Sequence, residues 1–410
     1  MDTARENKES IVKIAYVGAC DRNNYGDVLL PCLFDKYIKL ACEDQVCISS
    51  SFFALSRSDL RNIGGQITES IFDIANQDVV IVVGGEVMSA RYVNMYLNLQ
   101  TNKSYIKCFS ILSKVFYHIA DIVAKQKLNG KYAQPWIILP DSDSKVIYFA
   151  VGGVSSIVNN EKCKNDWMEC IKKARFFSVR NKRDFDVIAT LGLRRKCELV
   201  PDAAILVSKI WNSKKLDNLI TQQIKEIIQG TAKYYVLQLN KNYGKGKEKQ
   251  LANMILNIYD KKGYCCILLP IGRAQGHEDQ VPLNSAYNLV KNKNSNAAHY
   301  IEENTIFETM KIISCSMAFI GTSLHGAITA ASFEVPHVAV RNDAKVVPFL
   351  KTWNTTKITH FEHVREMEDY LIEEKFLNSL DIDKINEMKQ KAMAYMEYVM
   401  DIVFERGINS

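Results

Sequence analysis

The chain has 410 residues, more than one compact core normally holds, so two domains are expected. A hydrophobic fraction of 47% and a charged fraction of 24% are typical of a globular protein, and a formal charge of +6 is too small for a nucleic-acid-binding protein. The polar amino terminus and the absence of a long apolar run predict a cytoplasmic protein with no secretory signal and no membrane-spanning helix. Scattered cysteines without paired spacing predict reduced thiols rather than a zinc site.

The first half of the chain alternates between apolar runs and helical stretches. The runs predict strands at residues 11–17, 45–50, 78–83 and 145–151. A helix is expected over residues 27–40, with Asp27 as its N-cap. Several of these strands end in glycine, which is typical of a doubly wound α/β sheet. Ligands bind such sheets at the carboxyl ends of the strands, so the loops at 18–27, 84–89 and 152–156 should meet at one edge.

The same alternation restarts in the second half. Strands are predicted at residues 234–239, 264–270, 317–320 and 337–340, the last of these being the final strand. Helices are predicted at residues 251–260, 306–314, 325–333 and 382–404.

Together the two halves predict an α/β fold of two Rossmann-like lobes facing each other, the GT-B-like architecture. We expect an N-terminal, acceptor-side lobe over residues 1–205, a linker over 206–232 and a C-terminal, donor-side lobe over 233–360. Residues 361–410 are expected to form helices that pack back on the first lobe.

The strongest motif lies in the second lobe, where Gly321, Thr322 and Ser323 separate a strand from the helix that carries His325. Backbone N–H groups at a helix start form an anion site, and the two hydroxyl groups add donors. His325 stands in the first helical turn, where it can reach the same ligand. The alternative is that Thr322 only caps the helix and that His325 packs in the core.

Two further motifs follow strands of the first lobe. Asn24 and Asp27 follow the first strand, and Asp27 either caps the helix or binds a sugar hydroxyl. Gly84 and Gly85 let a ligand approach the backbone closely, and the carboxylate of Glu86 could take a proton from a hydroxyl. A simple capped turn and a close-packed turn with an exposed glutamate are the alternatives.

Charged residues complete the predicted cleft. Arg180 ends an apolar strand and suits two-point binding of phosphate or carboxylate, while Asp202 orients a ligand or an arginine. Arg273 follows a strand of the second lobe. The nearby residues 277–279 lack the spacing of a metal-binding motif, so no metal or other cofactor is expected.

The ordered set of these motifs resembles the polysaccharide pyruvyltransferase family over about residues 11–350. The matching segments are residues 24–27, 82–85, 178–180, 191–193, 201–202, 269–270, 277–279 and 321–326. The resemblance implies transfer of a pyruvyl group from phosphoenolpyruvate to a sugar of a cell-surface glycan or its lipid-linked precursor, which forms a ketal. It also implies that His325 is the acid/base residue and that Arg180 binds the phosphate or carboxylate of the donor.

The sequence departs from the family pattern at two positions. Family members often carry arginine directly before the Leu-His pair, where this chain has Ser323, so one donor-binding charge is missing. Arg273, Arg341 or Lys345 could replace it. Glu86 stands where the family tends to have a third glycine, which narrows the pocket and adds negative charge.

Other functions are consistent with the same sequence. One alternative is a GT-B glycosyltransferase that uses a nucleotide sugar, with Arg273 and Thr322 meeting the phosphates. Another is a non-catalytic homologue that kept the fold. The Ser323 substitution favours this last reading, while the presence of His325, Arg180 and Asp27 argues against it.

An unusually long basic excursion separates the Gly84–Gly85 loop from the next strand. Residues 87–140 hold seven cations and one acid, a net charge of 7 − 1 = +6. Apolar residues keep helical spacing between residues 106 and 123. Because basic amphipathic helices bind anionic membranes, we hypothesise that this segment docks the enzyme peripherally on the inner membrane face. The alternative is a helix that packs on its own core with a solvated basic face.

Overall fold

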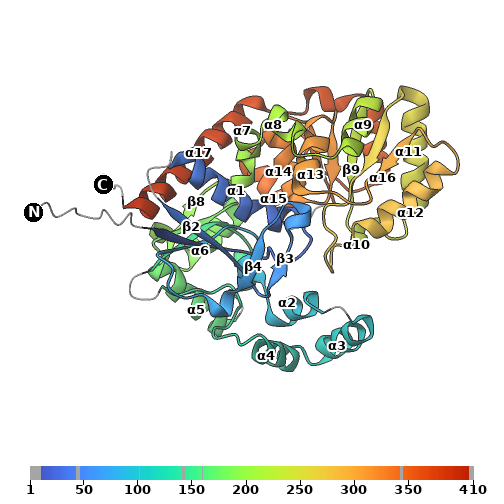
Figure 1. Ribbon diagram of the computed structural model, residues 1–410. Helices are drawn as coiled ribbons and strands as arrows, with labels where there is room; N and C mark the ends of the chain where they lie inside the picture. The colour runs from blue at the N-terminus through green and yellow to red at the C-terminus, as the bar shows by residue number, and fades with distance from the viewer. Residues whose placement is uncertain are drawn as a thin grey trace, which may run out of the picture.

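The protein folds into two lobes, each built on a parallel sheet (Figure 1). The computed structural model describes residues 11–42, 47–100, 102–140, 144–158, 160–341 and 345–405. The first lobe holds an eight-stranded sheet in the order β3-β4-β2-β1-β5-β6-β7-β8, in which only the β3–β4 pair is antiparallel. Its strands are β1 Val12–Val17, β2 Ile48–Ala54, β3 Ser58–Asp59, β4 Ile67–Ser70, β5 Val79–Val82, β6 Lys145–Val151, β7 Phe176–Val179 and β8 Glu198–Leu199.

Both faces of the centre of this sheet are buried, which explains why β5 and β6 are apolar without alternation. Along β1, Ile14 and Tyr16 belong to a core that continues into the second lobe, whereas Ala15 and Val17 belong to a separate core on the opposite face. The helices of this lobe are α1 Tyr25–Ala41, α2 Tyr92–Asn98, α3 Lys103–Val115, α4 Tyr117–Lys127, α5 Glu161–Lys173 and α6 Lys182–Thr190.

The second lobe holds a six-stranded parallel sheet in the order β11-β10-β9-β12-β13-β14. Its strands are β9 Tyr234–Gln238, β10 Cys265–Leu268, β11 Ala298–Tyr300, β12 Phe319–Gly321, β13 His337–Val340 and β14 His360–Phe361. Its helices are α10 Lys241–Gly244, α11 Glu248–Lys262, α12 Gln280–Lys291, α13 Ile306–Ser314, α14 Leu324–Ser332, α15 Val346–Trp353 and α16 Val364–Ile372. The predicted two-lobed α/β architecture is therefore confirmed.

Two segments join the lobes. Residues 206–232 contain the short helices α7 Val207–Ile210, α8 Ser213–Asp217 and α9 Gln222–Gly230, and side chains such as Leu216 and Ile224 are buried in the shared core. The long helix α17, Ile382–Phe404, contacts the first-lobe sheet: the Lys145 ammonium donates to the Ile402 carbonyl (3.0 Å), and the Phe176 and Tyr398 rings meet edge to face.

Several sequence-based boundaries were wrong. Helix α1 begins at Tyr25 with Asn24 at the N-cap position, so Asp27 lies in the first turn and is not the cap. Strand β2 runs on to Ala54 rather than ending at residue 50, and residues 45–46 of the predicted strand lie outside the described residues. The strand β13 is not the last, because β14 follows it and pairs with it in parallel.

The basic excursion forms a small helical unit of its own beneath the first lobe (Figure 1). Phe109 from α3 and Ala120 and Ala124 from α4 pack on Tyr92 and Leu97 of α2. No helix among the described residues combines the length and the apolar character that crossing a bilayer requires.

Candidate active site

A polar cavity of about 400 Å³ lies between the lobes, at the carboxyl ends of the strands. This is the edge where parallel α/β sheets bind ligands. Predicted site residues that line it are Asn24, Asp27, Gly84, Gly85, Glu86, Arg180, Thr322, Ser323, His325 and Lys345. Arg22, Gln238 and Asp279 also line the cavity and were not among the predicted site residues.

Backbone hydrogen bonds tie the loop after β1 to the second lobe. The Asn23 carbonyl accepts from the amides of Arg273 (3.0 Å) and Ala274 (2.9 Å), and the Tyr25 amide donates to the Ile271 carbonyl (2.9 Å). Beside this junction, the Asn24 amide group donates to the Asp27 carboxylate (2.7 Å). The loop of residues 23–27 therefore forms one wall of the cavity, and the side chain that binds the Asp27 carboxylate in it is neutral.

Gly26 makes room for the ring of His325. A Cβ atom at Gly26 would lie 1.7 Å from His325 Nδ1, so any side chain there would displace the imidazole. Since Gly26 is in the first turn of α1 and His325 is in the first turn of α14, the two helix starts meet at the cavity. Gly26 therefore allows the His325 side chain of the second lobe to approach the start of α1 closely.

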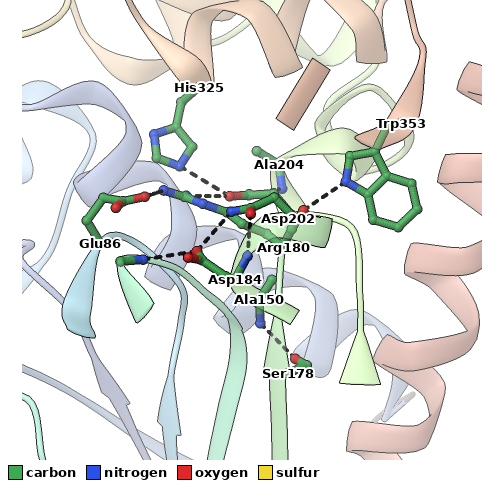
Figure 2. A network of polar contacts seen from close by, with 11 residues as sticks. Glu86, Ala150, Ser178, Arg180, Asp184, Asp202, Ala204, His325 and Trp353 are labelled. Atoms are coloured by element: carbon green, nitrogen blue, oxygen red, sulfur yellow. Dashed lines mark hydrogen bonds and ion pairs between the residues drawn. The ribbon is translucent and has the colours of Figure 1, made fainter. Parts of the chain in front are cut away.

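A buried ion network lies under the cavity floor, and Figure 2 shows its members converging on Arg180. The Arg180 guanidinium donates to Asp202 Oδ2 (3.0 Å) and, through its other terminal nitrogen, to Glu86 Oε1. Arg180 is only 2% exposed and Asp202 1%, whereas Glu86 is 22% exposed at the cavity wall. Arg180 therefore serves first to balance two carboxylates rather than standing ready for a ligand alone.

His325 completes this network from the second lobe (Figure 2). Its Nε2 lies 3.5 Å from Asp202 Oδ2, an ion-pair contact that leaves Nε2 without a hydrogen-bond partner among the described residues. Burial alone would raise the pKa of Asp202, but the nearby His325 and Arg180 charges lower it to about 2. Asp202 is thus a buried carboxylate that is ionised at neutral pH and lies where it can orient the His325 ring.

The start of α14 forms the wall opposite the first lobe. Ser323 is the N-cap, and its hydroxyl accepts from the Gly326 amide (3.2 Å). The Thr322 hydroxyl accepts from the Asn240 amide (3.0 Å), so Thr322 is not the cap. Gly321 ends β12 and is not among the lining residues; a Cβ there would lie 2.8 Å from Gln238 Oε1.

Asp279 is a second buried carboxyl group at the cavity. Its Oδ2 accepts from Gln238 Nε2 (2.7 Å) and from the Ile271 and Gly272 amides, while Oδ1 has no hydrogen-bond partner among the described residues. Burial raises its pKa to about 6 despite these bonds. The sequence placed residues 277–279 in the family resemblance but gave Asp279 itself no role at the site.

The prediction that Arg273 binds substrate in the cleft is wrong. Arg273 is not at the cavity: its guanidinium donates to the Ile301 carbonyl (3.1 Å) and to Asn304. It cannot replace the missing arginine in this conformation, because the 271–274 turn is held by first-lobe bonds and aims the side chain toward β11. Arg22 lines the cavity instead, paired with Asp21 (2.9 Å).

The fold and this site define a GT-B-like protein with a two-lobe cleft. Solved structures with the same fold include the UDP-GlcNAc 2-epimerase of Methanocaldococcus jannaschii, with a TM-score of 0.56 and 12% identity, covering 95% of this chain and 99% of that one. The UDP-GlcNAc 2-epimerase of Neisseria meningitidis has a TM-score of 0.54 and 13% identity, covering 96% of this chain and 100% of that one.

The sequence itself matches the family model of the polysaccharide pyruvyl transferases over residues 24–344. The chain belongs to this family, as the motifs predicted. Membership supports a transferase that acts on a polysaccharide. No match is found among curated protein sequences.

Proposed function

We propose that the protein transfers a pyruvyl group from phosphoenolpyruvate to a sugar of a cell-surface glycan or its lipid-linked precursor and forms a ketal. One observation carries the proposal: in a chain of the pyruvyl transferase family, His325 stands at the cavity 3.5 Å from the buried carboxylate of Asp202. A histidine so oriented can give and take a proton at one position, which is what ketal formation requires.

The reaction needs one acid and one base. Protonation of the methylene carbon of phosphoenolpyruvate creates an oxocarbenium-like carbon, which a sugar hydroxyl attacks while losing its proton. The C–O bond to phosphate then breaks and inorganic phosphate leaves. A second hydroxyl of the sugar closes the ketal, and its proton passes to His325, which gave up its own proton in the first step. His325 is the proposed acid, and Asp27 or Glu86 is the proposed base. Asp27 is better placed for this role, because its hydrogen-bond partner Asn24 is neutral while Glu86 is paired with Arg180.

The donor is an anion and needs positive potential. The start of α14 offers backbone N–H groups, and Arg22, Arg180 and Lys345 line the cavity. We propose that these groups hold the phosphate and carboxylate.

A nucleotide-sugar glycosyltransferase is the second candidate. The observation that favours it is the charge balance of the cavity: Arg22 and Arg180 are each paired with a carboxylate, Ser323 replaces the family arginine, and Arg273 is turned away. A nucleotide sugar spreads its charge over a larger molecule than phosphoenolpyruvate does, so its binding would need fewer unpaired cations in the cavity. The epimerases that share the fold are described as binding UDP-GlcNAc and UDP, which makes uridine diphosphate a suitable probe.

Calorimetric titration separates the two candidates. Phosphoenolpyruvate is titrated into the wild type, into His325→Ala and into His118→Ala, a control at an exposed histidine on α4. The proposal expects binding that is weakened only by the His325 change, together with phosphate release when a glycan acceptor is added. Binding of uridine diphosphate without binding of phosphoenolpyruvate would reject pyruvyl transfer in favour of the second candidate.

We also propose that the enzyme acts in the cytoplasm, peripherally bound to the inner membrane face where lipid-linked acceptors are held. The basic excursion over residues 87–140 is the segment proposed to bind there.

A further inference from the structure

The outer face of the helical excursion is unusually apolar. The described residues include 17 exposed large hydrophobic side chains, and eight of them lie between residues 105 and 122. Such a concentration marks an interaction surface, since exposed apolar residues are otherwise scattered singly. Six of them form what we call the apolar strip: Ile111, Leu112, Val115, Phe116, Ile119 and Ile122.

The strip arises because α3 and α4 are apolar on both sides. Their inner residues Phe109, Ala120 and Ala124 already pack on α2. On α3 the residues Ile111, Leu112 and Val115 recur at helical spacing outside this contact, and Val115 is 69% exposed. The alternative, a helix that packs on its own core with a solvated basic face, accounts for the packing on α2 but not for the exposed apolar residues.

Cations border the apolar strip. Lys107 and Lys114 are exposed on α3, and Lys127 is exposed at the end of α4. The one acid of the excursion, Asp121, accepts a hydrogen bond from the Val93 amide of α2, so its carboxylate is held against the helical unit. An apolar face bordered by lysines matches the boundary of an anionic bilayer, where lipid tails lie below phosphate groups.

The excursion is also continuous with the cavity wall. Met95 and Asn98 of α2 line the cavity, and α3 and α4 pack against the same helix. Figure 1 shows α3 and α4 at the lower edge of the molecule, away from the sheet of the second lobe. A surface that bound through α3 and α4 would thus lie near the wall of the cavity.

We propose that the apolar strip inserts into the interfacial layer of an anionic membrane and that Lys107 and Lys114 bind its phosphate groups. A second copy of the chain fits the strip less well, because pairing two excursions would bring two segments of net charge +6 together. The inference deepens the proposed membrane location and does not rest on the identity of the donor. Vesicle binding is measured without substrate, so its failure leaves pyruvyl transfer standing.

Flotation of the full chain with vesicles tests this inference. The wild type is expected to bind phosphatidylglycerol vesicles at low salt and not neutral phosphatidylcholine vesicles. The variant Val115→Ser/Ile119→Ser should bind roughly tenfold or more weakly, because two apolar side chains no longer enter the lipid. The variant Lys107→Gln/Lys114→Gln should bind roughly 30-fold more weakly at low salt.

Matched controls lie on the second lobe. Leu377→Ser removes a side chain that is 68% exposed, and Lys249→Gln/Lys261→Gln removes two exposed lysines of α11. Both should bind like the wild type. If the apolar double variant fails to fold, the Lys107 and Lys114 variant carries the test alone.

Three outcomes overturn the proposal. The first is no binding of the wild type to anionic vesicles. The second is equal loss of binding in the control variants. The third is a wild-type dimer by light scattering that becomes a monomer in Val115→Ser/Ile119→Ser, while this variant binds vesicles as the wild type does. A second copy of the chain would then cover the strip.

Discussion

Replacing Arg180 by methionine tests the buried ion network directly. The substitution keeps most of the side-chain length but leaves Asp202, which is 1% exposed, without its main counter-charge. Breaking a buried pair in this way costs about 3–5 kcal/mol. Asp202 would keep the Ala204 amide (3.1 Å) and the nearby His325, and Glu86 can turn to solvent. We therefore expect a loss near the lower limit, about 3 kcal/mol at pH 7.

Urea unfolding measures this loss, and a second substitution identifies its cause. Adding Asp202→Asn to Arg180→Met removes the uncompensated charge, so it should restore about 1–2 kcal/mol although it is a further change. The control Lys182→Met breaks only an exposed pair with Asp186 and should cost less than about 0.5 kcal/mol. A loss below about 1 kcal/mol for Arg180→Met, or no recovery in the double variant, would refute the electrostatic explanation.

Two buried carboxyl groups and one glycine give further predictions. Asp202, with a pKa of about 2 against ~3.9 unfolded, should contribute about 2–3 kcal/mol of stability that is present above pH ~4 and lost as the pH falls toward 2; urea unfolding should show no such component in Asp202→Asn. Asp279, with a pKa of about 6, has the opposite sign: stability should fall by about 2–3 kcal/mol as the pH rises from ~4 to ~6, and an identical fall in Asp279→Asn would contradict this assignment. Gly26→Ala should weaken phosphoenolpyruvate binding at least tenfold by displacing the His325 ring. The control Gly230→Ala should leave the affinity unchanged, because a Cβ atom there would have no neighbour within 4 Å. Equal affinities of the two variants by calorimetry would show that the position of the His325 ring does not affect binding.

The fold could be predicted largely because its central strands are buried on both faces and some of its helices begin at clear caps. The predicted limits of α13 and α17 match the structure, where Thr305 forms a capping box with Glu308 and Asp381 caps α17. The strands β11 and β14, which are three and two residues long, were missed because neither stands in an apolar run like the one that predicted β12. Strand β2 was cut short because its serines break the apolar run.

The location of the site could be predicted, but the pairing of its charges could not. Loops that follow parallel strands must meet at one edge of the sheet, so the sequence predicted that the glycine loop, Arg180 and His325 lie together, as they do at the cavity. Whether an arginine faces a ligand or another side chain depends on tertiary contacts: Arg180 pairs with Glu86, 94 residues away, and Arg273 turns to β11. The raised pKa of Asp279 could likewise not be predicted from the sequence, because it comes from burial in the folded protein.

The division of the network between the lobes makes the site depend on how the lobes meet. The first lobe supplies the carboxylate of Asp202, and the second supplies His325, so neither lobe holds this pair of side chains alone. Contacts across the boundary set their separation: the Tyr25 hydroxyl meets the Thr329 hydroxyl (2.7 Å), and the Trp353 indole donates to the Arg180 carbonyl (2.9 Å). His325 Nε2 has no hydrogen-bond partner among the described residues, so its 3.5 Å distance from Asp202 Oδ2 is set by these contacts between the lobes and not by a bond of its own.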